Sequence, residues 1–358
     1  MTADKPVRVM IVEDSPVLRA FLENVINHDP RLDVVASTAS AEEALSQLGE
    51  MRPDVISMDI RLPGMDGLEA TRLIMRQQPT PIVVLSASVD SESLQISMEA
   101  LRAGALAVLE KPPGAGHADY QRVAANLCTQ LYIMSQVKVV RQRIPRYRGS
   151  APTAAVSTTA TQSVPRKPSR LRMVGMAAST GGPKVFHTIL NGLPADFSLP
   201  ILVVQHMGES FMAGFATWLD SNCPQTVVVA KDGDIPRAGT VYVAPGDRHL
   251  ALNGNSLRIV DGEPVCGQRP SASVLFESMA RALGPRGLGV VLTGMGDDGA
   301  DGLLAMRRAG GFTIAEEKST AIVYGMPAAA VDIGAACVEL PLHAIAGKIF
   351  REVTNGAR

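Results

Sequence analysis

Residues 55–67 have the sequence Val-Ile-Ser-Met-Asp-Ile-Arg-Leu-Pro-Gly-Met-Asp-Gly. The uncharged run 55–58 is typical of a strand, and the stretch 67–78 after the Pro-Gly turn has the spacing of an amphipathic helix. A short strand that passes through a turn into a helix is the repeating unit of an α/β sheet. The segment therefore predicts one such unit, with the carboxylate of Asp59 at the carboxyl end of its strand.

The same alternation extends over residues 8–140. Further strands are predicted at 8–12, 32–36, 82–86 and 107–109, and further helices at 16–27, 41–49, 91–103 and from 119 to about 140. Five such repeats predict a doubly wound parallel sheet with helices on both faces, a (βα)5 domain. Ligands of these sheets bind at the carboxyl ends of the strands.

A second alternation begins at residue 173. Strands are predicted at 173–177, 201–205, 227–229, 288–292 and 312–315, and helices at 183–191, 211–222, 273–283, 299–309 and 343–353. This pattern predicts a second, larger α/β domain, doubly wound and Rossmann-like. Two extended runs, 240–244 and 256–260, flank a turn around Asn253-Gly254 and predict a β-hairpin insert in this domain.

The stretch between the two domains has a different composition. Residues 144–170 are rich in Pro, Ser, Thr and Ala, and they contain too little apolar surface to offset the entropy of ordering them. We therefore expect a first domain over 1–125, a helical extension with a flexible basic linker over 126–170, and a second domain over 171–358.

The near-zero net charge conceals an uneven distribution of charged residues along the chain. The chain has 358 residues, with 34 basic and 35 acidic side chains and a formal net charge of -1. Residues 1–119 carry 10 basic and 18 acidic side chains, residues 120–172 carry 10 basic and none acidic, and residues 173–358 carry 14 basic and 17 acidic. A basic middle suits nucleic acid, but no helix-turn-helix pattern follows it and few aromatic residues accompany it, so we expect no nucleic-acid partner.

Cysteine usage and hydropathy indicate the compartment. The four cysteines are widely separated and form no Cys-x-x-Cys pair, which argues against a disulfide framework or a zinc ribbon and fits a reducing cytosol. The N-terminus lacks the apolar core of a signal peptide, and no uncharged apolar stretch approaches the roughly 18 residues of a membrane span. We expect a soluble cytoplasmic protein with no direct membrane insertion.

The strand ends of the first domain carry a cluster of carboxylates. Glu13 and Asp14 follow the first strand, and Asp59 ends the neighbouring one. Like charges so close raise one another's pKa unless a cation intervenes, and Mg²⁺ prefers carboxylate and water ligands. Ser86 and Lys111, at the ends of the next two strands, add a hydroxyl and a cation. This set is suited to accepting and stabilising a phosphoryl group.

Each of these residues also has a structural interpretation. Asp14-Ser15-Pro16 is a good helix start, Asp59 could be an ordinary loop acid, and Lys111 could be an ordinary surface lysine. Their joint position at neighbouring strand ends favours the functional interpretation.

With the segment Met58–Gly67 and Lys111-Pro112, these residues resemble a response-regulator receiver domain over about residues 6–125. The resemblance implies that Asp59 is the phosphoacceptor, that Glu13 and Asp14 hold Mg²⁺ beside it, and that Ser86 and Lys111 contact the phosphoryl group. One departure is Val108, which stands where many receivers have an aromatic switch residue.

The strand ends of the second domain carry a different chemistry. Strand 173–177 runs into Ala178-Ser179-Thr180-Gly181-Gly182-Pro183, a sharp turn that would lift Ser179 out at the sheet edge above a helix N-terminus. The next strand ends in His206, a candidate base, and strand 288–292 leads to Asp297-Asp298, a candidate orienting acid. A serine, a histidine and an acid at three strand ends match the template of a serine hydrolase.

Structural interpretations exist here too. The Ser-Thr-Gly-Gly-Pro turn could only cap a helix or bind an anion, His206 could be a polar loop residue, and Gly294–Asp298 could be a simple turn into a helix. The three together are hard to explain as caps.

This half resembles the catalytic domain of the chemotaxis protein-glutamate methylesterases over about residues 171–355. The matching segments are residues 178–183, Gln205-His206-Met207, 242–249, Arg269-Pro270-Ser271, 292–299 and Gly325-Met326-Pro327. The resemblance implies Ser179 as nucleophile, His206 as base and Asp298 as orienting acid. It further implies the Met295 N–H as an oxyanion donor and Thr180 and His249 as pocket residues. Departures are Gln268 and Ser273, where the family commonly has histidine and aspartate, and Gly208-Glu209 in place of prolines.

The two resemblances imply a response regulator that hydrolyses glutamyl methyl esters of methyl-accepting chemotaxis receptors and deamidates receptor glutamines, without a metal for hydrolysis. They imply a histidine kinase as phosphodonor. Because the receiver precedes the enzyme in the chain, we further expect it to block the triad until Asp59 is phosphorylated. The alternative is a receiver-controlled binding module in a nonchemotactic pathway.

Overall fold

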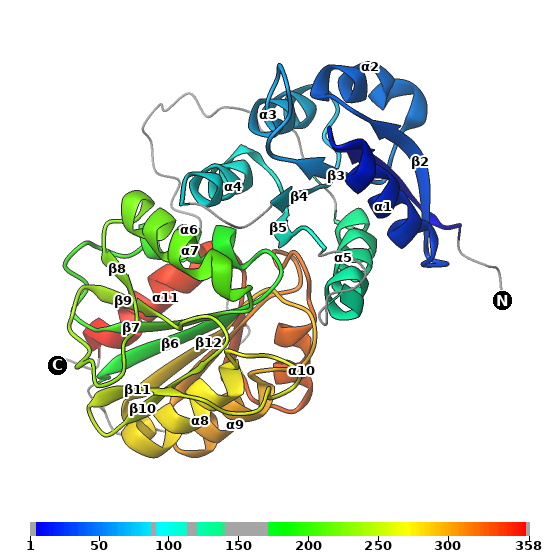
Figure 1. The fold of residues 1–358 in the computed structure, drawn as a ribbon. Helices are drawn as coiled ribbons and strands as arrows, with labels where there is room; N and C mark the ends of the chain where they lie inside the picture. Colours follow the sequence, from blue (N-terminus) through cyan, green and yellow to red (C-terminus); the bar gives the residue numbers. More distant parts are fainter. Residues whose placement is uncertain (1–4, 87–90, 113–119, 138, 140–170, 356–358) are drawn as a thin grey trace.

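The computed structural model describes residues 5–86, 91–112, 120–137, 139 and 171–355. They form two α/β domains, each built on one large, mostly buried sheet, with the first domain seated on the second (Figure 1). No helix among these residues is long and apolar enough to cross a membrane.

The first domain has the predicted (βα)5 architecture. Its strands have the order β2-β1-β3-β4-β5, and all neighbouring strands are parallel. The strands are β1 (Val7–Val12), β2 (Leu32–Thr38), β3 (Val55–Asp59), β4 (Ile82–Ser86) and β5 (Ala107–Glu110), and the helices are α1 (Pro16–Asn27), α2 (Ala41–Met51), α3 (Gly67–Gln77), α4 (Ser91–Ala103) and α5 (Tyr120–Ser135). Since the chain winds outward in both directions from β1 and β3, their carboxyl ends form the switch point where ligands of such sheets bind.

Side-chain caps define the starts of the first three helices. Ser15 and Ser40 accept hydrogen bonds through Oγ from the amides of Leu18 and Glu43, and Asp66 caps α3 in the same way. A proline follows Ser15 at the first helical position, where its missing N–H leaves no partner unsatisfied. These caps explain why the predicted starts of α1, α2 and α3 are correct.

Helix α5 packs on the sheet of the first domain and continues past residue 125, where we expected the helical extension to begin. Leu127, Leu131 and Met134 are buried in one hydrophobic cluster with Val9 and Ile11 of β1. The helix is continuous across the proposed boundary, and its apolar face covers the receiver sheet through Ser135. The predicted cap Asp119 and the predicted linker 144–170 lie outside the described residues.

The second domain contains a parallel sheet of the order β14-β13-β12-β6-β7-β9-β8. Its strands are β6 (Met173–Ala178), β7 (Ile201–Gln205), β8 (Thr226–Val229), β9 (Thr240–Val243), β12 (Gly287–Val291), β13 (Phe312–Glu316) and β14 (Val338–Leu340). Its helices are α6 (Gly182–Asn191), α7 (Glu209–Asn222), α8 (Ala272–Leu283), α9 (Ala300–Arg308), α10 (Met326–Asp332) and α11 (Leu342–Asn355), with a 3-10 turn at Gly284–Arg286. The winding direction reverses between β6 and β12, which makes their carboxyl ends the switch point.

The predicted hairpin is correct in its second strand and wrong in its first. The hairpin pairs β10 (His249–Asn253) with β11 (Ser256–Val260) across a two-residue turn in which Gly254 has φ +59°. Thr240–Val243 instead lies between β7 and β8 in the main sheet. Such a short turn pairs the residues immediately on either side of it, so a strand ending near residue 244 is too distant to be the partner.

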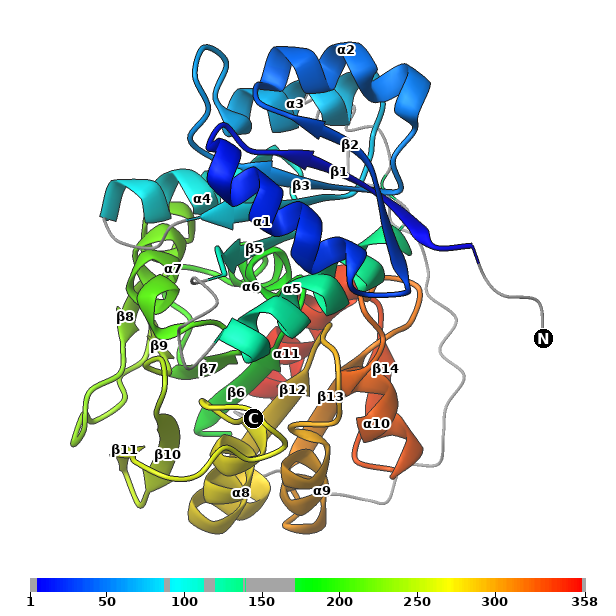
Figure 2. The ribbon, with the colours of Figure 1, turned by 45° about the vertical axis from the view of Figure 1, so that its right-hand side comes forward.

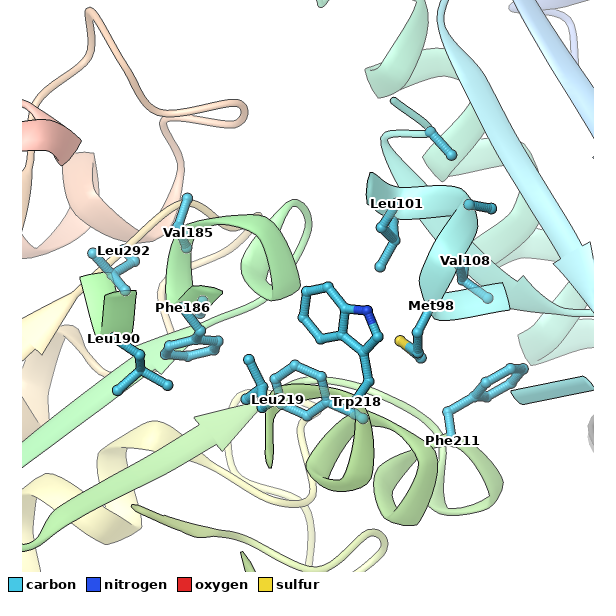
Figure 3. Packing of buried hydrophobic residues seen from close by; sticks show 14 of the residues in the cluster. Met98, Leu101, Val108, Val185, Phe186, Leu190, Phe211, Trp218, Leu219 and Leu292 are labelled. Carbon is cyan, nitrogen blue, oxygen red and sulfur yellow. The ribbon is translucent and has the colours of Figure 1, made fainter. Parts of the chain in front are cut away.

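The two domains share an apolar interface. Met98 and Leu101 of α4 and Val108 of β5 belong to the same buried cluster as Phe211 and Trp218 of α7 (Figure 3). All five are nearly fully buried. Val108, the departure from the aromatic switch position, belongs to the same buried cluster.

Candidate active site

The predicted nucleophile, base and acid lie together at the β6/β12 switch point. Ser179 follows β6, His206 follows the neighbouring β7, and the loop 293–299 follows β12 on the other side of β6. The His206 amide donates to the Ala178 carbonyl at 3.1 Å, which fixes the base beside the nucleophile turn.

The turn that carries Ser179 is held by hydrogen bonds on both sides. The Ser179 amide donates to the Thr293 carbonyl at 3.0 Å, and the Ser179 carbonyl accepts from Gly182 N at 2.9 Å and from Gln205 Nε2 at 2.8 Å. Gly181 has φ +82°, and a Cβ there would lie 2.7 Å from Ile322 Cδ1, so only glycine fits. The turn orients α6 so that its N-terminus points at the site. A helix N-terminus stabilises a developing negative charge.

His206 and Asp298 form the central pair of the site. Nε2 of His206 lies 2.7 Å from Oδ2 of Asp298, and the two side chains are 4% and 2% exposed. Because Asp298 accepts from Nε2, the lone pair of the neutral ring is on Nδ1. Nδ1 is buried and has no hydrogen-bond partner among the described residues. Nδ1 is therefore the atom free to accept a proton.

Asp298 is held at the N-terminus of α8. Ser271 Oγ donates to its Oδ1 at 2.7 Å, and the amides of Ala272 and Ser273 donate to it at 2.7 and 3.1 Å. Burial alone would raise the pKa of Asp298, but the hydrogen bonds and the neighbouring His206 outweigh it and lower the pKa below its ordinary value. The carboxylate therefore stays ionised and can stabilise an imidazolium.

His249, which we expected to line the pocket, lies beneath it. Its side chain is buried, Nδ1 accepts the Ser271 amide at 3.1 Å, and Nε2 lies 3.0 Å from the Glu263 carbonyl. The imidazole therefore supports Ser271 and does not face the substrate side. Ser273, the second departure, uses its hydroxyl to accept the Gly299 amide at 2.8 Å, so the acid loop is tied to α8 without a carboxylate there.

The other two expected pocket residues occupy different surroundings. Thr180 is buried, and its hydroxyl donates to the carboxamide oxygen of Gln130 on α5 of the first domain at 3.1 Å. Figure 2 shows α5 lying between the receiver sheet and the carboxyl ends of β6 and β12. Met295 lies in the loop between Thr293 and Asp298 and is 45% exposed.

The receiver cluster also assembles as predicted. Carboxylate oxygens of Glu13, Asp14 and Asp59 all lie within 4.8 Å of one another. Lys111 Nζ lies 2.8 Å from Glu13 and 2.9 Å from Asp59. The Ser86 hydroxyl is buried with no partner among the described residues, which fits a ligand contact.

The charges of this cluster compensate one another only in part. Burial, together with the nearby Asp59, raises the pKa of Glu13 against the opposing effect of Lys111. Burial would lower the pKa of Lys111, but its hydrogen bonds to both carboxylates raise it above the ordinary value. One lysine thus faces three carboxylates, so a hard divalent cation fits the donor set.

Sequence reasoning missed the residues that support the triad. Ser271 and Thr293 were part of matching segments but received no role, and Glu316 and Gln130 were not considered. The only signal for Ser271 was its position before a predicted helix, which is typical of an N-cap.

Comparisons with known proteins match both domains. A family model described as CheB methylesterase matches residues 174–349, and one described as response regulator receiver domain matches residues 9–117. A protein-glutamate methylesterase/protein-glutamine glutaminase of Paramagnetospirillum magneticum is 53% identical over 347 residues, 96% of this chain and 97% of the relative. Its counterpart in Nitrosospira multiformis is 43% identical over 350 residues, 98% of each chain.

Among solved structures, the CheB methylesterase catalytic domain of Thermotoga maritima is 35% identical, with a TM-score of 0.49, and covers 51% of this chain and 98% of its own. The two family models match the chain in the order in which the two domains are observed. The two near-full-length relatives carry the name of the same family. The chain belongs to the protein-glutamate methylesterase/protein-glutamine glutaminase family of response regulators.

Proposed function

We propose that the second domain hydrolyses γ-glutamyl methyl esters on methyl-accepting chemotaxis receptors and deamidates receptor glutamines, using Ser179, His206 and Asp298. The observation that carries the proposal is the 2.7 Å contact between His206 Nε2 and Asp298 Oδ2, which leaves Nδ1 free beside the serine turn. Cytoplasmic location follows from the same proposal, because the substrate glutamates lie on the receptors' cytoplasmic helices.

The reaction proceeds in two halves. Nδ1 of His206 takes the Ser179 proton as Oγ attacks the ester carbonyl, while Asp298 stabilises the imidazolium. The oxyanion is met by the amide of Met295 and the N-terminus of α6. His206 returns the proton to the leaving methoxide, which releases methanol. Water, deprotonated by His206, then cleaves the acyl-serine and yields the glutamate, and for a glutamine the leaving group is ammonia.

The direct test is methanol release from purified methylated receptors. Ser179→Ala should abolish release, because the acyl-enzyme cannot form. Labelling with a fluorophosphonate separates an esterase from the alternative, a binding module, since only an activated serine forms the adduct. An unlabelled Ser179 in the phosphorylated wild-type chain would contradict the esterase mechanism.

The receiver supplies control in this proposal. Glu13, Asp14 and Asp59 would hold Mg²⁺, which supplies charge neutralisation during phosphoryl transfer to Asp59 from a chemotaxis histidine kinase. Ser86 and Lys111 then contact the phosphoryl oxygens. The interface of α4 with α7 and the Gln130–Thr180 hydrogen bond hold α5 over the nucleophile turn. Phosphorylation weakens this interface and admits the substrate helix.

A further inference from the structure

A buried carboxylate that hydrolysis does not use lies behind the nucleophile turn. Glu316, the last residue of β13, is 0% exposed. Its Oε2 accepts the Thr293 amide at 2.9 Å, and its Oε1 accepts the Thr320 hydroxyl at 3.1 Å. Among the described residues no cationic side chain forms an ion pair with it.

Such a group is costly to keep in a protein interior. A carboxylate without water or a countercharge is destabilised, and burial raises the pKa of Glu316 while its two hydrogen bonds oppose that shift. Leucine or valine at the end of this buried strand would avoid the cost. The hydrogen bonds that Glu316 makes therefore point to a role beyond filling space.

The partner of Glu316 is the residue that holds the nucleophile turn. The Thr293 carbonyl accepts the Ser179 amide at 3.0 Å, and the Thr293 hydroxyl donates to the Thr180 carbonyl at 2.9 Å and accepts the Val323 amide at 2.9 Å. These bonds use the carbonyl and hydroxyl of Thr293 and leave its amide to Glu316.

The loop beside Thr293 is closely packed against the nucleophile turn. A Cβ on the next residue, Gly294, would lie 2.8 Å from Ser179 Cβ and 3.0 Å from Ser179 N. The same loop continues to Met295 and Asp298. A tilt of the Thr293 peptide would therefore displace the nucleophile and the acid loop together.

We propose that Glu316 is a positioning residue for the esterase, whose carboxylate fixes the Thr293 amide and thereby sets Ser179 against the acid loop. The inference rests on the proposed esterase function. The required property of Glu316 is a buried hydrogen-bond acceptor, which the carboxamide oxygen of glutamine also provides.

The test compares Glu316→Ala with Glu316→Gln in the full chain, assayed by methanol release and by the rate of fluorophosphonate labelling. We expect Glu316→Ala to lower kcat and the labelling rate about 10- to 100-fold with KM unchanged, the size expected of a small displacement of reacting groups. Glu316→Gln should restore both to within a fewfold of wild type. Glu317→Gln, one residue further on, is the matched control and should leave both unchanged.

Glu316→Asp serves if Glu316→Ala does not fold. It keeps the carboxylate but shortens the side chain by one methylene, which draws the acceptor away from the Thr293 amide, and should lower kcat with KM unchanged. Wild-type kcat in Glu316→Ala or in Glu316→Asp would overturn the inference, as would a Glu316→Gln variant as slow as the alanine variant. Absence of labelling in the phosphorylated wild-type chain would instead contradict the esterase function itself.

Discussion

The two strand-end sites of the molecule handle buried negative charge in opposite ways. The receiver gathers three carboxylates around one lysine and leaves Asp14 exposed to solvent. The esterase surrounds a single Asp298 with donors from Ser271, two amides and His206, and its triad pair is almost fully buried. The first arrangement leaves negative charge that a divalent cation would balance, and it suits a reversible charge change. The second is complete in itself and suits repeated proton transfer.

The largest effect expected from this comparison is at Asp298. Asp298→Asn should lower kcat by about 10⁴-fold, because an amide no longer selects the tautomer with its lone pair on Nδ1. Asp297→Asn is the matched control, since Asp297 is the exposed neighbour in the same loop. Methanol release from methylated receptors measures both. Equal losses in the two variants would contradict the assignment of Asp298 as the orienting acid.

The next effect is at the interface between the domains. Met98→Lys places a charge against Trp218 and Phe211. Because this position is buried, the charge destabilises the closed interface. We expect basal methanol release to rise about tenfold, as an opening equilibrium shifts by roughly 1.4 kcal/mol. Val228→Lys on β8, at a partly exposed position, is the control. Unchanged basal activity in Met98→Lys, with the receiver still folded, would argue against autoinhibition.

A smaller effect is expected at Ser271. Ser271→Ala removes one of the hydrogen bonds to Asp298 and the side-chain cap of α8, so kcat should fall roughly tenfold and unfolding free energy by about 1–2 kcal/mol. The kcat of methanol release measures the first loss, and a denaturant titration measures the second. Ser256→Ala, which removes a hydroxyl at the hairpin turn, is the control. The mechanism requires Ser271→Ala to lower kcat more than Ser256→Ala does.

The smallest effect concerns pH and stability. The pKa of Asp298 is lower in the folded chain than in the unfolded one, so its ionised form stabilises the fold above the unfolded carboxyl pKa. This contribution is lost as the pH falls through the lowered folded pKa. Asp298→Asn should therefore lose less thermal stability than wild type on acidification from pH 6 towards about pH 3. A steeper loss in the variant would contradict the lowered pKa.

The elements and the gathering of the candidate site residues at strand ends were predictable from the sequence because both depend on local patterns. The sequence alone shows which strand ends carry an acid, a serine turn or a histidine. Ser15, Ser40 and Asp66 likewise indicate where helices start. Two sets of features were not predictable in this way.

One set depends on contacts between distant segments. Three supporting hydrogen bonds join residues that lie 27, 23 and 50 positions apart in the sequence. They are the bonds of Ser271 with Asp298, of Glu316 with Thr293 and of Gln130 with Thr180. The first strand of the predicted hairpin was assigned wrongly for a related reason. Alternating apolar residues mark an extended or helical segment but not the sheet or the domain that it joins.

The most direct test of the account follows methanol release and fluorescence in one sample of the full chain. Trp218 is the chain's single tryptophan and is buried in the interface between the domains, so its emission reports opening. On addition of Mg²⁺ and a small-molecule phosphodonor, we predict that methanol release rises while the Trp218 emission shifts to longer wavelength, and that Asp59→Asn abolishes both changes. Phosphorylation of Asp59 with neither change would contradict the claim that the receiver controls the esterase through this interface.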